Sequence, residues 1–151
     1  MQATAPLYDT DFYAWTKTQT AALQQKAFEQ LDIANLIEEI EDMGKSQHRQ
    51  LESRFAILIA HLLKWQFQPD KRSRSWQATI RTQRRHIHKL LAQNPSLRPT
   101  VPEAINDAYA DALDIAWAET GLDESLFPAE VPYTPGQILD ESFFVTQWLK
   151  S

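Results

Sequence analysis

One stretch of this sequence groups residues whose types and spacing could do chemistry. The residues are Glu38, Glu39, Glu41 and Asp42, followed by His48 and His61. On a helix, positions three and four apart are neighbours, so Glu38, Glu41 and Asp42 share one face. Carboxylate oxygens bind divalent metal ions, and a histidine can transfer protons near neutral pH. A metal-dependent hydrolase using Glu38, Glu41, Asp42 and His61 is therefore one hypothesis.

The spacing of these residues also supports a simpler interpretation. Di-metal helical bundles place Glu-x-x-His on a helix, and this pattern is missing here. His48 and His61 lie 13 residues apart, too far along a helix to share an ion. Lys and Arg from a neighbouring helix would compensate the carboxylates without catalysis. We favour ion pairs, and we assign no catalytic residue, metal ligand or cofactor.

The second candidate site is the basic, aromatic segment "HLLKWQFQPDKRSRSW", residues 61–76. Its cations could bind phosphates and its rings could stack on bases, as in nucleic-acid surfaces. In that case residues 64–89 would form the contact, with Arg81, Arg84 and Arg85 on the following helix. Alternatively, Trp65 and Trp76 pack a helix corner while the arginines bond carboxylates. The combined candidate interaction or ion-pair site is Glu38, Glu41, Asp42, His61, Lys64, Trp65, Arg72, Arg74 and Trp76.

Three histidines lie close to the basic residues. His61 precedes Lys64 and Trp65 by one helical turn, so it could serve acid–base chemistry. A packed histidine with one satisfied nitrogen is the more common case on an apolar helix face. His86 and His88, within the Arg-rich helix, are expected to be solvated.

Composition sets the class of protein. The chain has 151 residues, three Gly, no Cys and a net charge of −5. The absence of Cys excludes disulfides and thiolate metal sites, and we expect a cytoplasmic protein. No signal-peptide pattern and no membrane-spanning window is seen. This length predicts one helical domain over residues 1–151.

Helix-start and helix-stop signals divide the chain. Asp32 is expected to cap a helix whose apolar stripe is Ile33, Leu36, Ile37, Ile40 and Met43. Gly44 should introduce a kink or short break, since Gly in a helix interior costs roughly 1 kcal/mol. Pro69 ends this helix, and Ser73 or Ser75 caps the next. Later helix starts are predicted at Thr100, which with Glu103 has capping-box spacing, and at Thr134 before Pro135.

Several long segments resemble a known family. They are "DFYAWTKTQ", "DIANLIEEIEDMGKSQHRQLESR", "HLLKWQFQPDKRSRSWQATIRTQRR" and "VPYTPGQILDESFF". The chain is similar to the Domain of Unknown Function 29 family from about Leu7 to Phe144. The resemblance implies a small, mostly cyanobacterial type of helical protein without an assigned activity.

We therefore predict an all-α bundle of about four to five main helices with a short Pro-rich C-terminal cap. Residues 32–66 and 73–94 should form its central antiparallel pair. The acidic cluster precedes Lys64 by about 22 residues, or roughly 33 Å of straight helix. A composite acidic–basic site thus depends on a bend at Gly44. We expect a non-catalytic interaction or regulatory module with a protein partner or as a homo-oligomer, and nucleic-acid binding is the alternative.

Overall fold

The computed structural model describes residues 6–143, within which every regular element is helical and no strand occurs. The chain divides into two compact units, Met1–Lys45 and Ser46–Ser151, here called the N-terminal and C-terminal units. The boundary falls inside one long helix, α3 (Ile33–Phe67). The all-α prediction is confirmed, and the single domain expected from chain length stays a prediction.

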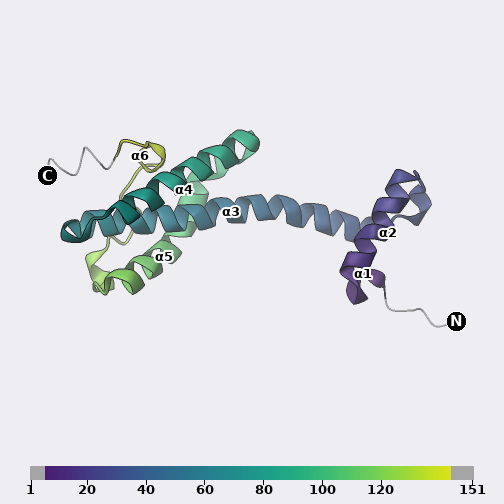
Figure 1. Cartoon of the computed structure of the whole chain (residues 1–151), viewed down its shortest axis with the longest axis horizontal. Coiled ribbons are helices and arrows are strands. Elements are labelled where there is room, and N and C mark those ends of the chain that lie inside the picture. Colours follow the sequence, from purple (N-terminus) through teal and green to yellow (C-terminus); the bar gives the residue numbers. More distant parts are fainter. Residues whose placement is uncertain (1–5, 144–151) are drawn as a thin grey trace. The chain divides into compact units, whose positions relative to one another are not determined.

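The N-terminal unit contains α1 (Leu7–Thr10), α2 (Phe12–Gln24), a 3-10 turn (Phe28–Gln30) and the start of α3. Asp11 caps α2 by accepting a hydrogen bond from the Ala14 amide at 3.0 Å. Three aromatic rings then pack together, with the Trp15 centroid 4.8 Å from Tyr8 and 5.5 Å from Phe12. This aromatic cluster holds α1 beside α2. Figure 1 shows the two helices as neighbours.

Asp32 caps the start of α3, as the sequence predicted. Its carboxylate accepts hydrogen bonds from the Asn35 side chain at 2.8 Å and from the Trp15 indole at 3.0 Å. These donors, Asn35 first, lower the pKa of Asp32. The Asp32 amide in turn donates to the buried Gln19 side chain at 2.7 Å. One residue therefore caps α3 and joins it to α2.

The short break predicted at Gly44 is absent. The α3 helix runs without interruption from Ile33 to Phe67, and Gly44 does not have a positive φ. A Cβ built at Gly44 would meet nothing within 4 Å. One glycine costs the helix roughly 1 kcal/mol, which is small compared with the favourable free energy of propagating a 35-residue helix.

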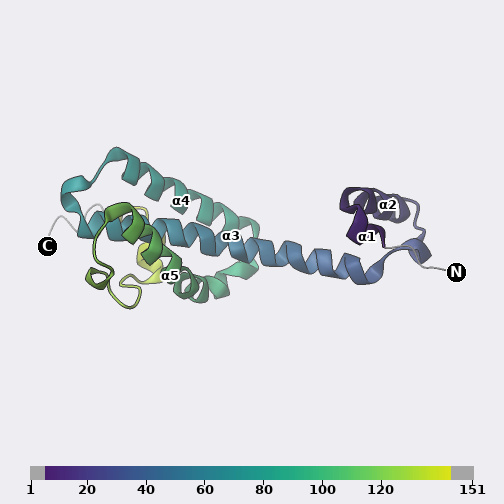
Figure 2. The same cartoon turned by 90° about the horizontal axis from the view of Figure 1, so that it is seen from below.

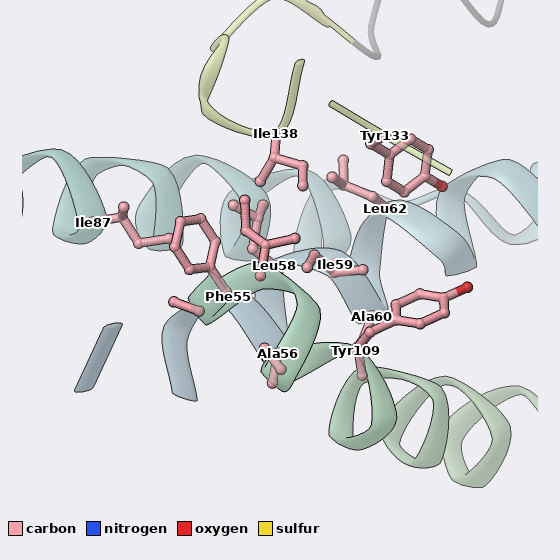
Figure 3. Packing of buried hydrophobic residues seen from close by; sticks show 14 of the residues in the cluster. Phe55, Ala56, Leu58, Ile59, Ala60, Leu62, Ile87, Tyr109, Tyr133 and Ile138 are labelled. Atoms are coloured by element: carbon pink, nitrogen blue, oxygen red, sulfur yellow. The ribbon is translucent and has the colours of Figure 1, made fainter. Parts of the chain in front are cut away.

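The C-terminal unit packs α4 (Arg74–Gln93) and α5 (Val101–Thr120) along the C-terminal part of α3 (Figures 1 and 2). Their apolar stripes form one core, shown in Figure 3, to which Phe55 and Leu58 of α3 and Ile87 of α4 contribute fully buried side chains. The predicted pairing of residues 32–66 with residues 73–94 is thus the framework of this unit. None of its helices, nor any other within residues 6–143, is long and apolar enough to cross a membrane.

The helix ends in this unit agree with the sequence signals except at the start of α5. Ser73 caps α4 by accepting from the Trp76 amide at 3.2 Å, and Gly121 ends α5 with a φ of +70°. The capping box predicted at Thr100 is wrong, because Thr100 has helical backbone angles and no capping hydrogen bond. A 3-10 segment (Pro95–Thr100) instead leads directly into α5.

The Pro-rich segment after α5 is fastened to the bundle by tyrosines. The Tyr109 hydroxyl donates to the Pro128 carbonyl at 2.7 Å, and the Tyr133 hydroxyl donates to the Gln66 side chain at 2.7 Å. Burial raises the pKa of Tyr109 to about 12. The short helix α6 (Pro135–Leu139) follows, with Thr134 as its cap and Pro135 at its first position as predicted, and the Gln137 side chain completes a capping box.

Candidate functional site

The apolar stripe predicted at the start of α3 forms an exposed surface of the N-terminal unit. Ile33, Ile37, Ile40 and Met43 retain 55%, 51%, 61% and 61% of their accessible surface. Their spacing of four, three and three residues places them along one side of the helix. We call these four residues the α3 stripe. Such an unpartnered apolar row is typical of a contact surface.

Acidic side chains border the α3 stripe. Between Ile33 and Met43 the sequence has four carboxylates and no basic residue. Glu41 follows Ile37 by four positions and so lies beside the stripe, and it is exposed together with Glu38 and Asp42. The fourth carboxylate, Glu39, accepts a hydrogen bond from the Tyr8 hydroxyl. That bond is the main reason why the pKa of Tyr8 is raised.

The carboxylates do not form the metal site considered from the sequence. Within residues 6–143, Glu38, Glu41 and Asp42 do not belong to a group of three ligand atoms that converge on one point. They are exposed side chains on one helix, and Asp42 lies three residues before Lys45, the last residue of the N-terminal unit. The hydrolase hypothesis therefore has no support from their geometry.

Lys64 occupies a buried corner of the C-terminal unit. Its ammonium lies 2.6 Å from the Glu119 carboxylate of α5 and 4.7 Å from the Trp76 ring centroid, while the side chain is almost fully buried. The ion pair predicted for Lys64 is present, but its partner is a residue of α5. Lys64 is thus a structural residue of the α3–α5 contact and is not displayed to a ligand.

Arg72 closes the same corner at the end of α3. Its Nε donates to the Trp65 carbonyl at 2.8 Å, and its guanidinium lies 5.0 Å from the Trp65 ring centroid. These contacts match the structural interpretation of the two tryptophans as packing residues. Arg74, the first residue of α4, is exposed.

His61 faces the interior of the same unit and is half-buried. Its Nδ1 lies 2.9 Å from the Ile57 carbonyl oxygen, a distance at which it donates a hydrogen bond. Burial lowers the pKa of His61, and the nearby charge of Lys64 lowers it further. His61 is therefore a packed histidine whose neutral form is favoured by its surroundings, as expected for the structural alternative.

The predicted nucleic-acid residues of α4 divide into two groups. Arg81 and Arg85 are exposed, but Arg84 is only 1% exposed, so its expected surface position is wrong. Arg84 donates to the carbonyls of Ile138 at 2.7 Å and of Gln137 and Glu141 at 3.3 Å each. Burial lowers the pKa of Arg84 to about 10.

A cationic groove lies between α3 and α4 of the C-terminal unit. It has a volume of about 240 Å³, and its polar lining includes Arg54, His86 and Lys89. Burial and the positive charges of Arg54, Arg85 and Lys89 lower the pKa of His86. Within residues 6–143, Arg85 and Lys89 form no ion pair.

Sequence comparison assigns the chain to a family. The family model described as Domain of unknown function DUF29 matches residues 7–144. The chain belongs to the DUF29 family. No curated protein and no solved structure gives a significant match.

In this DUF29 protein, sequence reasoning missed that Arg84 and His88 of α4 both contact carbonyl oxygens near the end of α6. We call this arrangement the clamp on α6. His88 was expected to be solvated, but it is half-buried and its Nε2 lies 2.9 Å from the Leu139 carbonyl oxygen. Arg84 and His88 are four residues apart on α4, so both reach the C-terminal carbonyls of α6. Their position between the apolar residues Ile80, Ile87 and Leu91 was the signal that they face inward.

Proposed function

We propose that this DUF29 protein is a non-catalytic interaction module that binds a partner protein through the α3 stripe. The observation that supports this function is the exposure of Ile33, Ile37, Ile40 and Met43. Complete burial of an aliphatic side chain contributes about 1.5–3 kcal/mol, so covering each half-exposed residue contributes about half of that. The stripe is thus large enough to anchor a helix or strand of another protein.

The charges beside the stripe favour a basic partner. Glu38, Glu41 and Asp42 are exposed and lack an intervening Lys or Arg. A second copy of the same surface would bring these carboxylates close to one another, which is unfavourable. An amphipathic helix with Lys or Arg beside its apolar face would complement both features. Such a partner fits a cytoplasmic adaptor or regulator.

A pair of designed peptides tests this proposal. Both are 18-residue amphipathic helices with Leu on one face, flanked by Lys in one peptide and by Glu in the other. Fluorescence anisotropy with the full chain should show binding of the Lys peptide and much weaker binding of the Glu peptide. Ile37→Asp with Ile40→Asp should abolish binding, because a carboxylate then replaces the apolar contact.

Charge reversal supplies the matched control. Glu38→Lys with Glu41→Lys should exchange the preference for the two peptides, while Glu124→Lys with Glu130→Lys, also exposed, should leave it unchanged. Binding that is insensitive to the Ile37 and Ile40 substitutions would refute the proposed surface. Size-exclusion chromatography with light scattering should show a monomer; a dimer disrupted by Ile40→Asp would assign the stripe to self-association instead.

A second candidate function, nucleic-acid binding, is favoured by the groove between α3 and α4. Arg81, Arg85 and Lys89 are exposed on α4, and Arg54 and Lys89 line the groove. Phosphate groups would compensate these charges, and binding would weaken as salt increases. Lys64, Arg72 and Arg84, which are engaged inside the unit, do not belong to this surface.

Anisotropy with labelled single-stranded and duplex DNA and RNA tests this candidate. Arg85→Ala with Lys89→Ala should weaken binding and reduce the magnitude of the salt slope by about two, or one per lost phosphate contact. Lys17→Ala, an exposed cation of the N-terminal unit, serves as the control. Absence of salt-sensitive binding at micromolar protein would exclude this function.

A further inference from the structure

Three ligand-type side chains from two helices converge in the C-terminal unit. His48 and Glu52 lie four residues apart on α3, and the His48 Nε2 is 3.1 Å from the Glu52 Oε1. Asp107 approaches them from α5. One ligand atom of each residue lies within 4.8 Å of the other two. This is the one group of three such residues within positions 6–143.

We propose that His48, Glu52 and Asp107 bind a divalent transition-metal ion such as Zn²⁺. One imidazole nitrogen and two carboxylate oxygens are a ligand set that zinc accepts in proteins. Zinc–ligand distances of about 2.0–2.2 Å place neighbouring ligand atoms roughly 3.3–3.6 Å apart. Since the three atoms are already within 4.8 Å, small side-chain rotations would complete the coordination. The imidazole disfavours Ca²⁺ and Mg²⁺, which prefer oxygen ligands.

The charges around the site also call for a cation. Glu52 and Asp107 bring two carboxylates to one place, and no Lys or Arg forms an ion pair with either within the described residues. His48 contacts Glu52, but one histidine compensates at most one of the two carboxylates. A divalent ion would compensate both and would also take up the imidazole nitrogen.

Metal binding at this site would join α3 to α5 near the start of α5. His48 and Glu52 are half-buried and Asp107 is exposed, so a fourth coordination position would remain open to water. Binding to the folded arrangement alone would stabilise the C-terminal unit. This inference is independent of the proposed partner-binding function, because it involves none of the residues of the α3 stripe.

Titration of the full chain with Zn²⁺, after chelator treatment and without a His-tag, tests the site. Calorimetry should show one ion per chain, and the melting temperature should rise with Zn²⁺ but not with Mg²⁺. Asp107→Asn and His48→Gln should each weaken zinc binding by about tenfold or more. Glu103→Gln and Asp111→Asn, one turn to either side of Asp107 on α5, should bind like the wild type.

Substitution with Co²⁺ gives a spectroscopic readout of the ligands. Visible absorption bands of a nitrogen- and oxygen-ligated ion should appear in the wild type and in Asp111→Asn, and should be lost in His48→Gln. The metal-free melting temperatures of Asp107→Asn and wild type report whether the variant folds normally. Zinc binding of equal affinity in wild type, Asp107→Asn and His48→Gln would overturn the proposal, as would the absence of any one-to-one binding.

Discussion

The two units of this protein differ in how far their large apolar side chains are exposed. Eleven large apolar side chains of the described residues are exposed, and nine of them lie in the N-terminal unit. Up to residue 143, the C-terminal unit exposes only Trp117 and Leu126 among its large apolar side chains, and it contains the entire main core cluster. Buried apolar residues of the N-terminal unit are Trp15 and Ala22. The N-terminal unit, with its minimal core and large apolar surface, is suited to contact with another protein. The C-terminal unit, which contains the main core, is suited to stabilise the fold.

The helix α3 makes this comparison within one element. Its apolar periodicity continues from Ile33 to Leu63, but the apolar side chains from Ile33 to Met43 are mostly exposed and those from Leu51 to Leu63 are mostly buried. Periodicity therefore identifies the apolar face of a helix without identifying what covers it. In the C-terminal unit the cover is α4 and α5, and in the N-terminal unit we propose that it is a partner protein.

The same substitution at two positions of α3 gives the largest expected contrast. Ile59 is fully buried and Ile40 is 61% exposed. Ile59→Ala should lower the free energy of unfolding by about 2–5 kcal/mol, because it leaves a cavity in the core. Ile40→Ala should change it by less than about 0.5 kcal/mol. Urea unfolding read by hydrogen exchange in each unit measures both, and a large cost at Ile40 would show that the α3 stripe is already packed.

Two adjacent arginines of α4 form a second matched pair. Arg84→Ala should destabilise the C-terminal unit by about 3 kcal/mol, since three carbonyls near the end of α6 lose a buried charged donor. Arg85→Ala, on the exposed side, should change stability by at most about 0.5 kcal/mol. Thermal and urea unfolding measure the difference, and equal effects would contradict the clamp on α6.

The effect of pH on stability should be smaller than the effects of the Ile59 and Arg84 substitutions, and it should be specific to the C-terminal unit. Because the pKa of His61 is lower in the folded state, the unfolded chain binds its proton more readily. The free energy of unfolding should therefore fall as pH decreases below about 6.5, by at most about 1.4 kcal/mol per pH unit. His61→Gln should reduce this slope between pH 6.5 and 5. Identical slopes in the two proteins would show that His61 does not contribute.

Local signals in the sequence predicted much of the fold. Asp32, Ser73 and Thr134 each cap the helix that they were expected to cap, because a side-chain cap involves only residues three positions apart. The capping prediction at Thr100 was wrong because the preceding 3-10 segment already has helical backbone angles at that position. The clamp by Arg84 and His88 could not be predicted, since its acceptors lie more than 50 residues away in sequence.

The candidate site was predicted in composition but not in arrangement. The sequence identified the apolar and acidic residues of 33–43, and it gave the apolar ones only as the stripe of a bundle helix, without naming them as a contact surface. It identified Lys64 as an ion-pair residue, yet its partner, Glu119, comes from a distant helix. Long-range partners depend on tertiary packing, which spacing along one helix does not specify.

Site-specific photo-crosslinking tests the difference between the two units most directly. A benzophenone amino acid replaces Ile40 in one variant and Trp117 in another, both exposed positions, and the cells that naturally contain the protein are irradiated. The account predicts a discrete adduct at position 40, formed with a segment of another protein whose apolar residues are flanked by Lys or Arg, and no such adduct at position 117. Equal labelling at the two positions, or an adduct at position 40 only with a second copy of this chain, would contradict it.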